Sequence, residues 1–299
     1  MIGETLVVER RGQDDPQAST EARSARGAAS RMAAGDLDQE VDSSQRDEIG
    51  ALARSFAEMR DAFGWDMLLN VSANSNEAVD LGELPTLNLS STQQHREGYP
   101  LFGWWVFELE GYADANNNGI IEVGELTVSD ERVYVGQPLP RFEAALTNGI
   151  DLLGRRLRLS GMIDYKGGHK VYNNTERIRC ASRLNCDGLV NPEASLFEQA
   201  RTVLVREHST RSVGGYIEDG DFIRLRELSI VYNVPEALAG RLFRGRSLVA
   251  TAAARNLAML WTKYSGVDPE AFGTTGDAPS SFQAFAPPTF YTLRFTFGL

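Results

Sequence analysis

The sequence contains no long hydrophobic run. A membrane-spanning helix needs about 18 or more consecutive apolar residues, so the sequence predicts no transmembrane helix. The opening stretch MIGETLVVERRGQDDPQAST also lacks the basic-then-apolar order of a secretory signal peptide, and we expect none there. The 42% hydrophobic share fits a globular protein and a membrane β-barrel equally well, because barrel strands alternate apolar and polar residues.

Positive charge is in deficit. The chain has 30 lysines and arginines against 41 acidic residues, which gives a net charge of −11. Binding of nucleic-acid phosphates requires clustered positive charge. We therefore expect no nucleic-acid partner.

Cysteine and histidine are rare. The two cysteines, Cys180 and Cys186, occur in CASRLNC and are close enough to close a small loop, which suits a disulfide in an oxidising compartment. Their spacing alone leaves two free thiols open as the alternative. The three histidines, His95, His169 and His208, show no metal-ligand spacing and are interpreted as loop residues. Without a phosphate-binding glycine loop or a nucleophile elbow, the sequence predicts no enzyme.

The N-terminal fifth of the chain changes from irregular to helical. Residues 1–20 have little apolar periodicity and are predicted to be disordered. From Glu21 an α-helical hairpin is predicted, and Asp47 is placed to cap its second helix. Apolar residues follow in that helix at alternating steps of three and four, as on a coiled-coil seam: Ile49, Leu52, Phe56, Met59 and Phe63.

Residues 21–62 resemble a HAMP domain, the parallel helical relay of bacterial membrane receptors. The resemblance rests on the connector GDLDQEV, with Gly35, Leu37 and Val41, and on the following DEIGALARSFAEM. It implies a role in signal transduction. Glu21 stands where that family usually has a proline, and no membrane helix precedes the segment. An amphipathic hairpin without a signalling role is the alternative.

After Phe63 the apolar period changes to two. The alternation is present in GWDMLLNVSANSN, in RRLRLSGMIDYKGG and in the closing FYTLRFTFGL. Strands of about ten residues with one apolar face are typical of a transmembrane barrel. We predict a mainly β fold, a partial antiparallel transmembrane β-barrel of about 8–10 strands behind the N-terminal α-helical hairpin. A soluble β-sandwich is the alternative.

Several local features are predicted within this region. In FIRLRELSIVYNVP the apolar parity switches, which indicates a bulge near Arg226 or Glu227. Residues 111–132, 173–215 and 262–288 are polar and are expected to be long loops, with a short helix in NPEASLFEQARTVL. The turn KGGHK is interpreted as a solvated strand end. The aromatic residues of GYPLFGWWVF fit an interfacial girdle or packing under a loop: Tyr99, Trp104, Trp105 and Phe107.

Residues 63–299 resemble the C-terminal part of SusC/RagA-type TonB-dependent receptors. The resemblance is carried by GYPLFGWWVFELEGYADANNNGII, VGQPLPRFEAALTNGIDL, YIEDGDFIRLRELSIVYNVP, ARNLAMLWTKYSGVDPE and the last strand. It implies an outer-membrane nutrient importer with a plugged barrel of about 22 strands. The N-terminal plug, the remaining strands and the energy-coupling box have no counterpart here. We therefore expect a receptor fragment that does not function alone, with the outer membrane and the missing receptor parts as partners.

The two resemblances imply different compartments. A HAMP relay works at an inner membrane, whereas barrel strands assemble in the outer membrane. Phe63 leads directly into Gly64 without a Gly-, Ser- or Pro-rich linker. We interpret the junction as a truncated receptor gene joined to a HAMP fragment by rearrangement, frameshift or faulty sequence assembly. A real fusion, and a HAMP-type signal-transduction fragment as the functional part, remain the alternatives.

The stretch DANNNGIIEVGE matches the calcium-loop pattern D-x-N-x-N-G-x5-E. Gly119 would allow the tight turn that wraps oxygen ligands around the cation. Weak calcium binding is predicted, because two asparagines replace charged ligands. A turn held by Asn side chains without metal is the alternative. The expected ligands are Asp114, Asn116, Asn118, the Ile120 carbonyl, Glu122 and Glu125.

Overall fold

The computed structural model describes residues 63–243, 247–271, 280–282 and 284–298. The disordered segment predicted for residues 1–20 and the HAMP-like helices predicted for residues 21–62 lie outside these ranges. None of the helices within them is both long and apolar enough to cross a membrane. The chain divides into two compact units, Met1–Trp65 with Ile150–Arg158 and Asp66–Gly149 with Leu159–Leu299. The second unit contains the predicted calcium loop and both cysteines.

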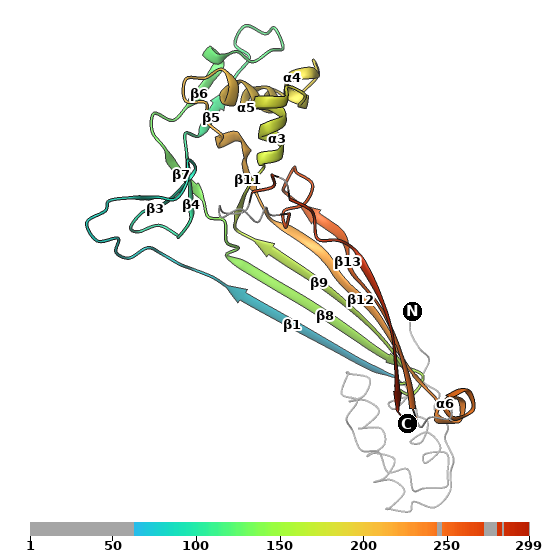
Figure 1. Ribbon diagram of the computed structural model, residues 1–299. Helices are drawn as coiled ribbons and strands as arrows, with labels where there is room; N and C mark the ends of the chain where they lie inside the picture. The colour runs from blue at the N-terminus through green and yellow to red at the C-terminus, as the bar shows by residue number, and fades with distance from the viewer. Residues whose placement is uncertain (1–62, 244–246, 272–279, 283, 299) are drawn as a thin grey trace, which may run out of the picture. The chain divides into compact units, whose positions relative to one another are not determined.

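The largest element is a six-stranded sheet in the order β1-β8-β9-β12-β13-β14 (Figure 1). The long strands are thus neighbours in the same order in which they follow along the chain, and β12, β13 and β14 pair antiparallel. This confirms a mainly β fold, and β1 and β14 are the outermost strands of this sheet. The bounds are β1 Gly64–Ala73, β8 Phe142–Leu152, β9 Leu157–Gly167, β12 Phe222–Val234, β13 Ser247–Thr262 and β14 Phe290–Gly298.

The register of β12 confirms the predicted bulge. Its pairing with β13 shifts between Ile223 and Arg224 and again between Leu225 and Glu227. A bulge changes the parity of the residues that follow it. The shifts therefore accommodate the switch in apolar parity that the sequence shows.

The final strand, whose apolar alternation the sequence shows, pairs antiparallel with β13. Ser247 lies opposite Gly298, and Arg255 lies opposite Phe290. Every second residue of β14 is apolar and at least half exposed: Tyr291 77%, Leu293 68%, Phe295 53% and Phe297 50%. On β1 the same holds for Trp65, Met67, Leu69 and Val71. Both outermost strands therefore leave at least half of each of these apolar side chains exposed.

Three smaller sheets are formed by short strands. In the four-stranded sheet, Trp104 and Trp105 are 1% and 3% exposed, and Trp104 packs with Val106 and Ile217. The interfacial girdle is therefore wrong for these two tryptophans, because they lie in a loop core instead. The bounds are β2 Leu87–Asn88, β3 Gln93–His95, β4 Gly103–Val106 and β7 Val133–Gly136; β5 Leu109–Tyr112 and β6 Leu126–Val128; β10 Lys170–Tyr172 and β11 Ile217–Asp219.

The helices lie in the segments between strands, and α3, α4 and α5 gather together beside β5 and β6 (Figure 1). Helix α5, Leu196–Arg206, confirms the helix expected after Pro192, and Ser195 caps it by accepting a hydrogen bond from the Glu198 amide. The other helical turns are η1 Val123–Glu125, α3 Asn174–Ile178, η2 Arg179–Arg183, α4 Asp187–Val190, η3 Gly214–Tyr216 and α6 Glu236–Phe243.

Candidate functional site

The predicted calcium loop is a tight turn closed by its own side chains. The Asp114 carboxylate accepts hydrogen bonds from the Asn118 amide at 3.0 Å and the Gly119 amide at 2.8 Å. The Asn118 side chain accepts from the Ile120 amide at 2.7 Å, and Gly119 has the positive φ of 79° that the turn requires. The structure therefore brings the first half of the predicted ligand set into one turn.

Glu125 closes the second half of the loop. One carboxylate oxygen accepts from the Ala115 amide at 2.8 Å, and the other accepts from the Glu122 amide at 3.0 Å. Among the described residues, however, the only trio of His, Cys, Asp or Glu ligand atoms within 4.8 Å of one another is Glu176, Cys180 and Cys186. The carboxylates of the loop thus serve as acceptors for backbone amides. These bonds are what a turn held without metal would show.

Gln199 joins this loop to helix α5. Its side-chain oxygen accepts from the Ile121 amide at 3.0 Å, and its side-chain nitrogen donates to the carbonyls of Gly119 and Ala194, both at 3.1 Å. Gln199 is 8% exposed, and its bonds with Ile121 and Ala194 are buried, whereas the bond to Gly119 is partly buried. The sequence pattern did not identify this residue, because its partners lie about eighty positions away.

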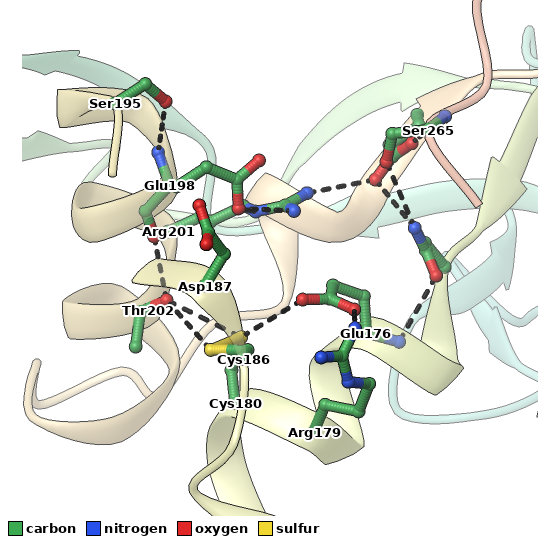
Figure 2. Close-up of polar contacts among 12 residues, drawn as sticks. Glu176, Arg179, Cys180, Cys186, Asp187, Ser195, Glu198, Arg201, Thr202 and Ser265 are labelled. Carbon is green, nitrogen blue, oxygen red and sulfur yellow. Dashed lines mark hydrogen bonds and ion pairs between the residues drawn. A yellow bond between two sulfur atoms is a disulfide. The ribbon is translucent and has the colours of Figure 1, made fainter. Parts of the chain in front are cut away.

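Cys180 and Cys186 form a disulfide in the structure, with their Cα atoms 4.9 Å apart. Both are fully buried and pack with Val205 and Tyr216. Figure 2 shows the disulfide between the segment that follows α3 and helix α5, where Thr202 lies 3.5 Å from Cys180 Sγ. Thr202 donates its proton to the Glu198 carbonyl at 2.7 Å, which is closer than either sulfur atom. The disulfide therefore closes a loop between two cysteines six positions apart, and it packs against Val205 of α5 in an apolar cluster.

Arg201 is the charged centre of the same region. Its guanidinium donates to Glu198 at 2.8 Å and to Glu218 at 3.0 Å, and it lies 4.9 Å from the ring centroid of Tyr216. Only 4% of the Arg201 side chain is exposed. Burial raises the pKa of Tyr216 to about 12, so this phenol stays neutral beside the ion pairs.

A second ion network fastens the segment after β13 to the long sheet. Arg224 donates to Asp268 at 2.6 Å, and Arg226 donates to Glu270 at 3.0 Å and to Asp164 at 3.0 Å. Although burial acts to raise the pKa of Glu270, its contacts with Arg226, Lys166 and Arg224 hold that pKa below its ordinary value. Glu270 is therefore ionised at neutral pH and binds two strands at once.

His169 corrects the interpretation of KGGHK as a solvated strand end. The His169 side chain is 4% exposed, and burial lowers its pKa in spite of the nearby Asp221. Asp221 accepts from the Gly168 amide at 2.7 Å and from Lys263 Nζ at 2.8 Å. Asp221 thus links the turn, through Gly168, to Lys263 in the segment that follows β13. His95 lies in strand β3 and pairs with Leu87, so its interpretation as a loop residue is wrong, whereas His208 lies outside the strands and contacts the Thr210 hydroxyl.

Comparison with known proteins confirms both resemblances predicted from the sequence. The HAMP domain family matches residues 23–64. TonB-dependent receptor P3 of Formosa agariphila is 24% identical over 244 residues, which cover 70% of this chain and 23% of that receptor. TonB-dependent receptor P26 of the same organism is 25% identical over 254 residues, covering 72% of this chain and 25% of the receptor.

Solved structures give the same fold. The RagAB peptide transporter matches 78% of this chain with a TM-score of 0.54 and 18% identity, and the RagAB peptide importer in its open-open state matches 80% with a TM-score of 0.56 and 17% identity. In both cases the match covers 27% of the larger chain. The chain therefore spans about a quarter of the length of its relatives, which are receptors and transporters by name.

Proposed function

We propose that residues 63–299 are a section of an outer-membrane TonB-dependent receptor, in which they supply consecutive wall strands and the loops that join them. The observation that carries this proposal is the order of the six long strands, which are neighbours in the sheet in the order of the chain. That order, with antiparallel pairing, is typical of an up-and-down barrel wall. The exposed alternate apolar residues of β1 and β14 would then face lipid.

The proposed role is nutrient transport, with no enzymatic step. The RagAB structures carry the description peptide transporter, so a peptide is one class of nutrient that a related receptor binds. The section described here would act together with the rest of a receptor, because a sheet with two open edges cannot enclose a pore. Its partners would be the outer membrane, the receptor's plug and remaining strands, and the nutrient.

We propose the turn at Asp114–Glu125 as a weak calcium site in one of the loops, with the Ile120 carbonyl and Glu122 completing the ligand set. Support comes from the ligand pattern and from the tight turn at Gly119. Calcium would replace backbone amides as the partner of the Glu125 carboxylate. Its role would be to stiffen the loop and not to take part in a reaction.

A second candidate function is HAMP-type signal transduction. The observation that favours it is the family match over residues 23–64, which ends where β1 begins. Membrane fractionation of cells that produce the full chain separates the two proposals. The receptor proposal expects the chain in the outer-membrane fraction, and recovery in the inner membrane or cytosol would favour the signalling fragment. Sequencing of the genomic locus would show whether the junction at Phe63 and Gly64 is real.

A further inference from the structure

A cavity of about 220 Å³ lies at the end of strand β4, and its walls come from the bend before β3, the residue before β7 and the segment after α5. This volume is below the roughly 300–1,000 Å³ of pockets for drug-sized ligands, but several times the roughly 30 Å³ that one water molecule occupies in the liquid. The cavity therefore suits a small polyatomic group. The other lining residues are apolar, so no carboxylate belongs to the lining, and the polar ones are Ser91, Thr92, Arg132, Thr210, Arg211 and Ser212.

The two arginines of this lining have no carboxylate partner. Within the described ranges, neither Arg132 nor Arg211 forms an ion pair, and neither guanidinium donates a hydrogen bond. Arg132 lies 6.0 Å from the ring centroid of Phe107, which leaves its N–H groups available. Arg224 and Arg226, in contrast, are each paired with two carboxylates. In a chain with an excess of acidic residues, two unpaired arginines beside one cavity provide positive charge that an anion can meet.

Contacts with the end of β4 hold the backbone beside both arginines. The Ser129 hydroxyl accepts from the Glu108 amide at 2.9 Å, and the Ser129 amide donates to the Glu108 carbonyl at 3.0 Å, which fixes the segment that leads into β7. The segment after α5 is fixed in the same place, because Ser212 donates to the Phe107 carbonyl at 2.5 Å. A Cβ on Gly214 would lie only 2.5 Å from that carbonyl oxygen, so this segment packs closely against the strand. The two arginines therefore extend from a backbone that is already in place.

A buried hydroxyl in the lining gives independent support. Thr92 is 9% exposed. Its neighbour Ser90 accepts hydrogen bonds from the Thr92 amide at 3.2 Å and the Gln93 amide at 3.1 Å, so both lone pairs of the Ser90 hydroxyl are in use. Ser90 is therefore the donor in its 3.3 Å contact with the Thr92 hydroxyl. The Thr92 proton then has no acceptor among the described residues, and a buried donor that stays unpaired costs free energy.

We propose that this cavity binds a tetrahedral oxyanion, a phosphate or sulfate group, which accepts from Arg132, Arg211 and the Thr92 hydroxyl. Arginine forks match the oxygens of such a group, and charge-assisted hydrogen bonds are roughly twice as strong as neutral ones. A tetrahedral group has enough oxygens to serve two guanidiniums and a hydroxyl at once, whereas a carboxylate has fewer. All three donors lie in one compact unit. The inference therefore goes beyond the receptor role, because binding requires neither a closed barrel nor a plug.

Inorganic phosphate is the probe, and acetate is the carboxylate comparison. The full chain is folded into detergent micelles in a phosphate-free buffer, its disulfide is verified by mass, and binding is measured by calorimetry. We expect phosphate to bind, sulfate to compete with it, and acetate to bind far more weakly. Glycerol 1-phosphate distinguishes two sources of the group. Tighter binding of this ester than of free phosphate would assign the group to a larger organic molecule, and weaker binding would assign it to the free ion.

Variants separate the site from the general charge of the chain. Arg211→Gln should weaken phosphate binding on the order of tenfold, the effect of one charge-assisted hydrogen bond. Arg156→Gln removes the same charge from an exposed arginine outside the cavity and should leave binding unchanged. Thr92→Val keeps the shape of the side chain but removes its hydroxyl, and it should weaken binding roughly two- to tenfold.

Equal weakening by Arg211→Gln and Arg156→Gln would overturn the proposal, because it would show that phosphate responds only to net charge. Binding of acetate as tight as that of phosphate, or no binding of phosphate, would also overturn it. Phenylglyoxal, which modifies arginine side chains, provides a measurement on the unmutated chain. Phosphate should protect Arg132 and Arg211 from modification but not Arg156, and equal modification with and without phosphate would contradict the site.

Discussion

Arg226 on β12 donates to Glu270, in the segment after β13, through two nitrogens at 3.0 and 3.1 Å. Glu270 also lies 3.2 Å from Arg224 and 3.4 Å from Lys166. One carboxylate thus receives three cationic side chains from β9 and β12. These contacts link the segment after β13 to the long sheet.

Glu270→Gln should loosen this segment. The substitution keeps the shape of the side chain but leaves three cations without their shared carboxylate, and we expect a loss of about 1–3 kcal/mol in the free energy of unfolding. Glu227→Gln is the matched control, because its pair with Arg255 is far more exposed and should cost less than about 0.5 kcal/mol. Limited proteolysis of the detergent-folded chain, with mapping of cuts in 263–271, provides the measurement. Equal cutting in both variants would contradict the role of Glu270.

Calcium should protect the 114–125 loop from proteolysis, with weak affinity. Glu125→Ala should abolish the protection, since it removes the ligand that closes the loop. Because Glu125 also accepts from two backbone amides, Glu125→Gln is the better control for loop closure: it retains an acceptor and removes the charge. The site does not exist if calcium leaves the cutting pattern of the unmutated chain unchanged.

Cys180 and Cys186 should be unreactive toward thiol reagents after export to an oxidising compartment. Reduction under denaturing conditions should make both thiols reactive. In the folded chain the disulfide should resist reduction, because both cysteines are fully buried. Mass spectrometry after alkylation, with and without prior reduction, counts the labelled cysteines. Two labels on exported protein that was never reduced would refute the bond.

A positive charge on the apolar face of β14 should destabilise the chain in a bilayer far more than a positive charge on the opposite face. Leu293→Arg should cost about 2–4 kcal/mol in a lipid bilayer, the effect of a cation near the midplane of a barrel's lipid-facing surface. Thr292→Arg, one position away, should cost much less because its side chain points to the opposite face. Urea titration of the chain in lipid vesicles measures both. Equal costs would favour the soluble β-sandwich.

Local patterns in the sequence predicted the local structure well. The parity switch in FIRLRELSIVYNVP located the bulge in β12, and the alternation of the closing segment located β14 and its face. The helix after Pro192 was also predicted, although it begins later, at Leu196, where Ser195 supplies the cap. Each of these features depends on residues a few positions apart, which is the range that periodicity covers.

Contacts between distant segments were not predictable in the same way. An interfacial girdle was one of two interpretations of Trp104 and Trp105. In the structure, Trp104 is buried in a core that includes Ile217. No sequence motif marks Gln199, Arg201 or Glu270. Their contacts are with residues of other strands and loops that lie far away in the sequence. A single sequence shows that such residues are polar. It does not show which charged or polar residue will contact each of them in the folded chain.

The most direct test of the account is the behaviour of the purified chain in water and in a bilayer. The six-stranded sheet ends in β1 and β14, whose apolar side chains are exposed and whose outer edges no described strand covers. Such a surface favours aggregation in water. Size-exclusion chromatography without detergent should therefore yield aggregate, and planar bilayers should show no channels. A monodisperse soluble monomer, or ion-conducting channels formed by this chain alone, would contradict the account of an incomplete barrel wall.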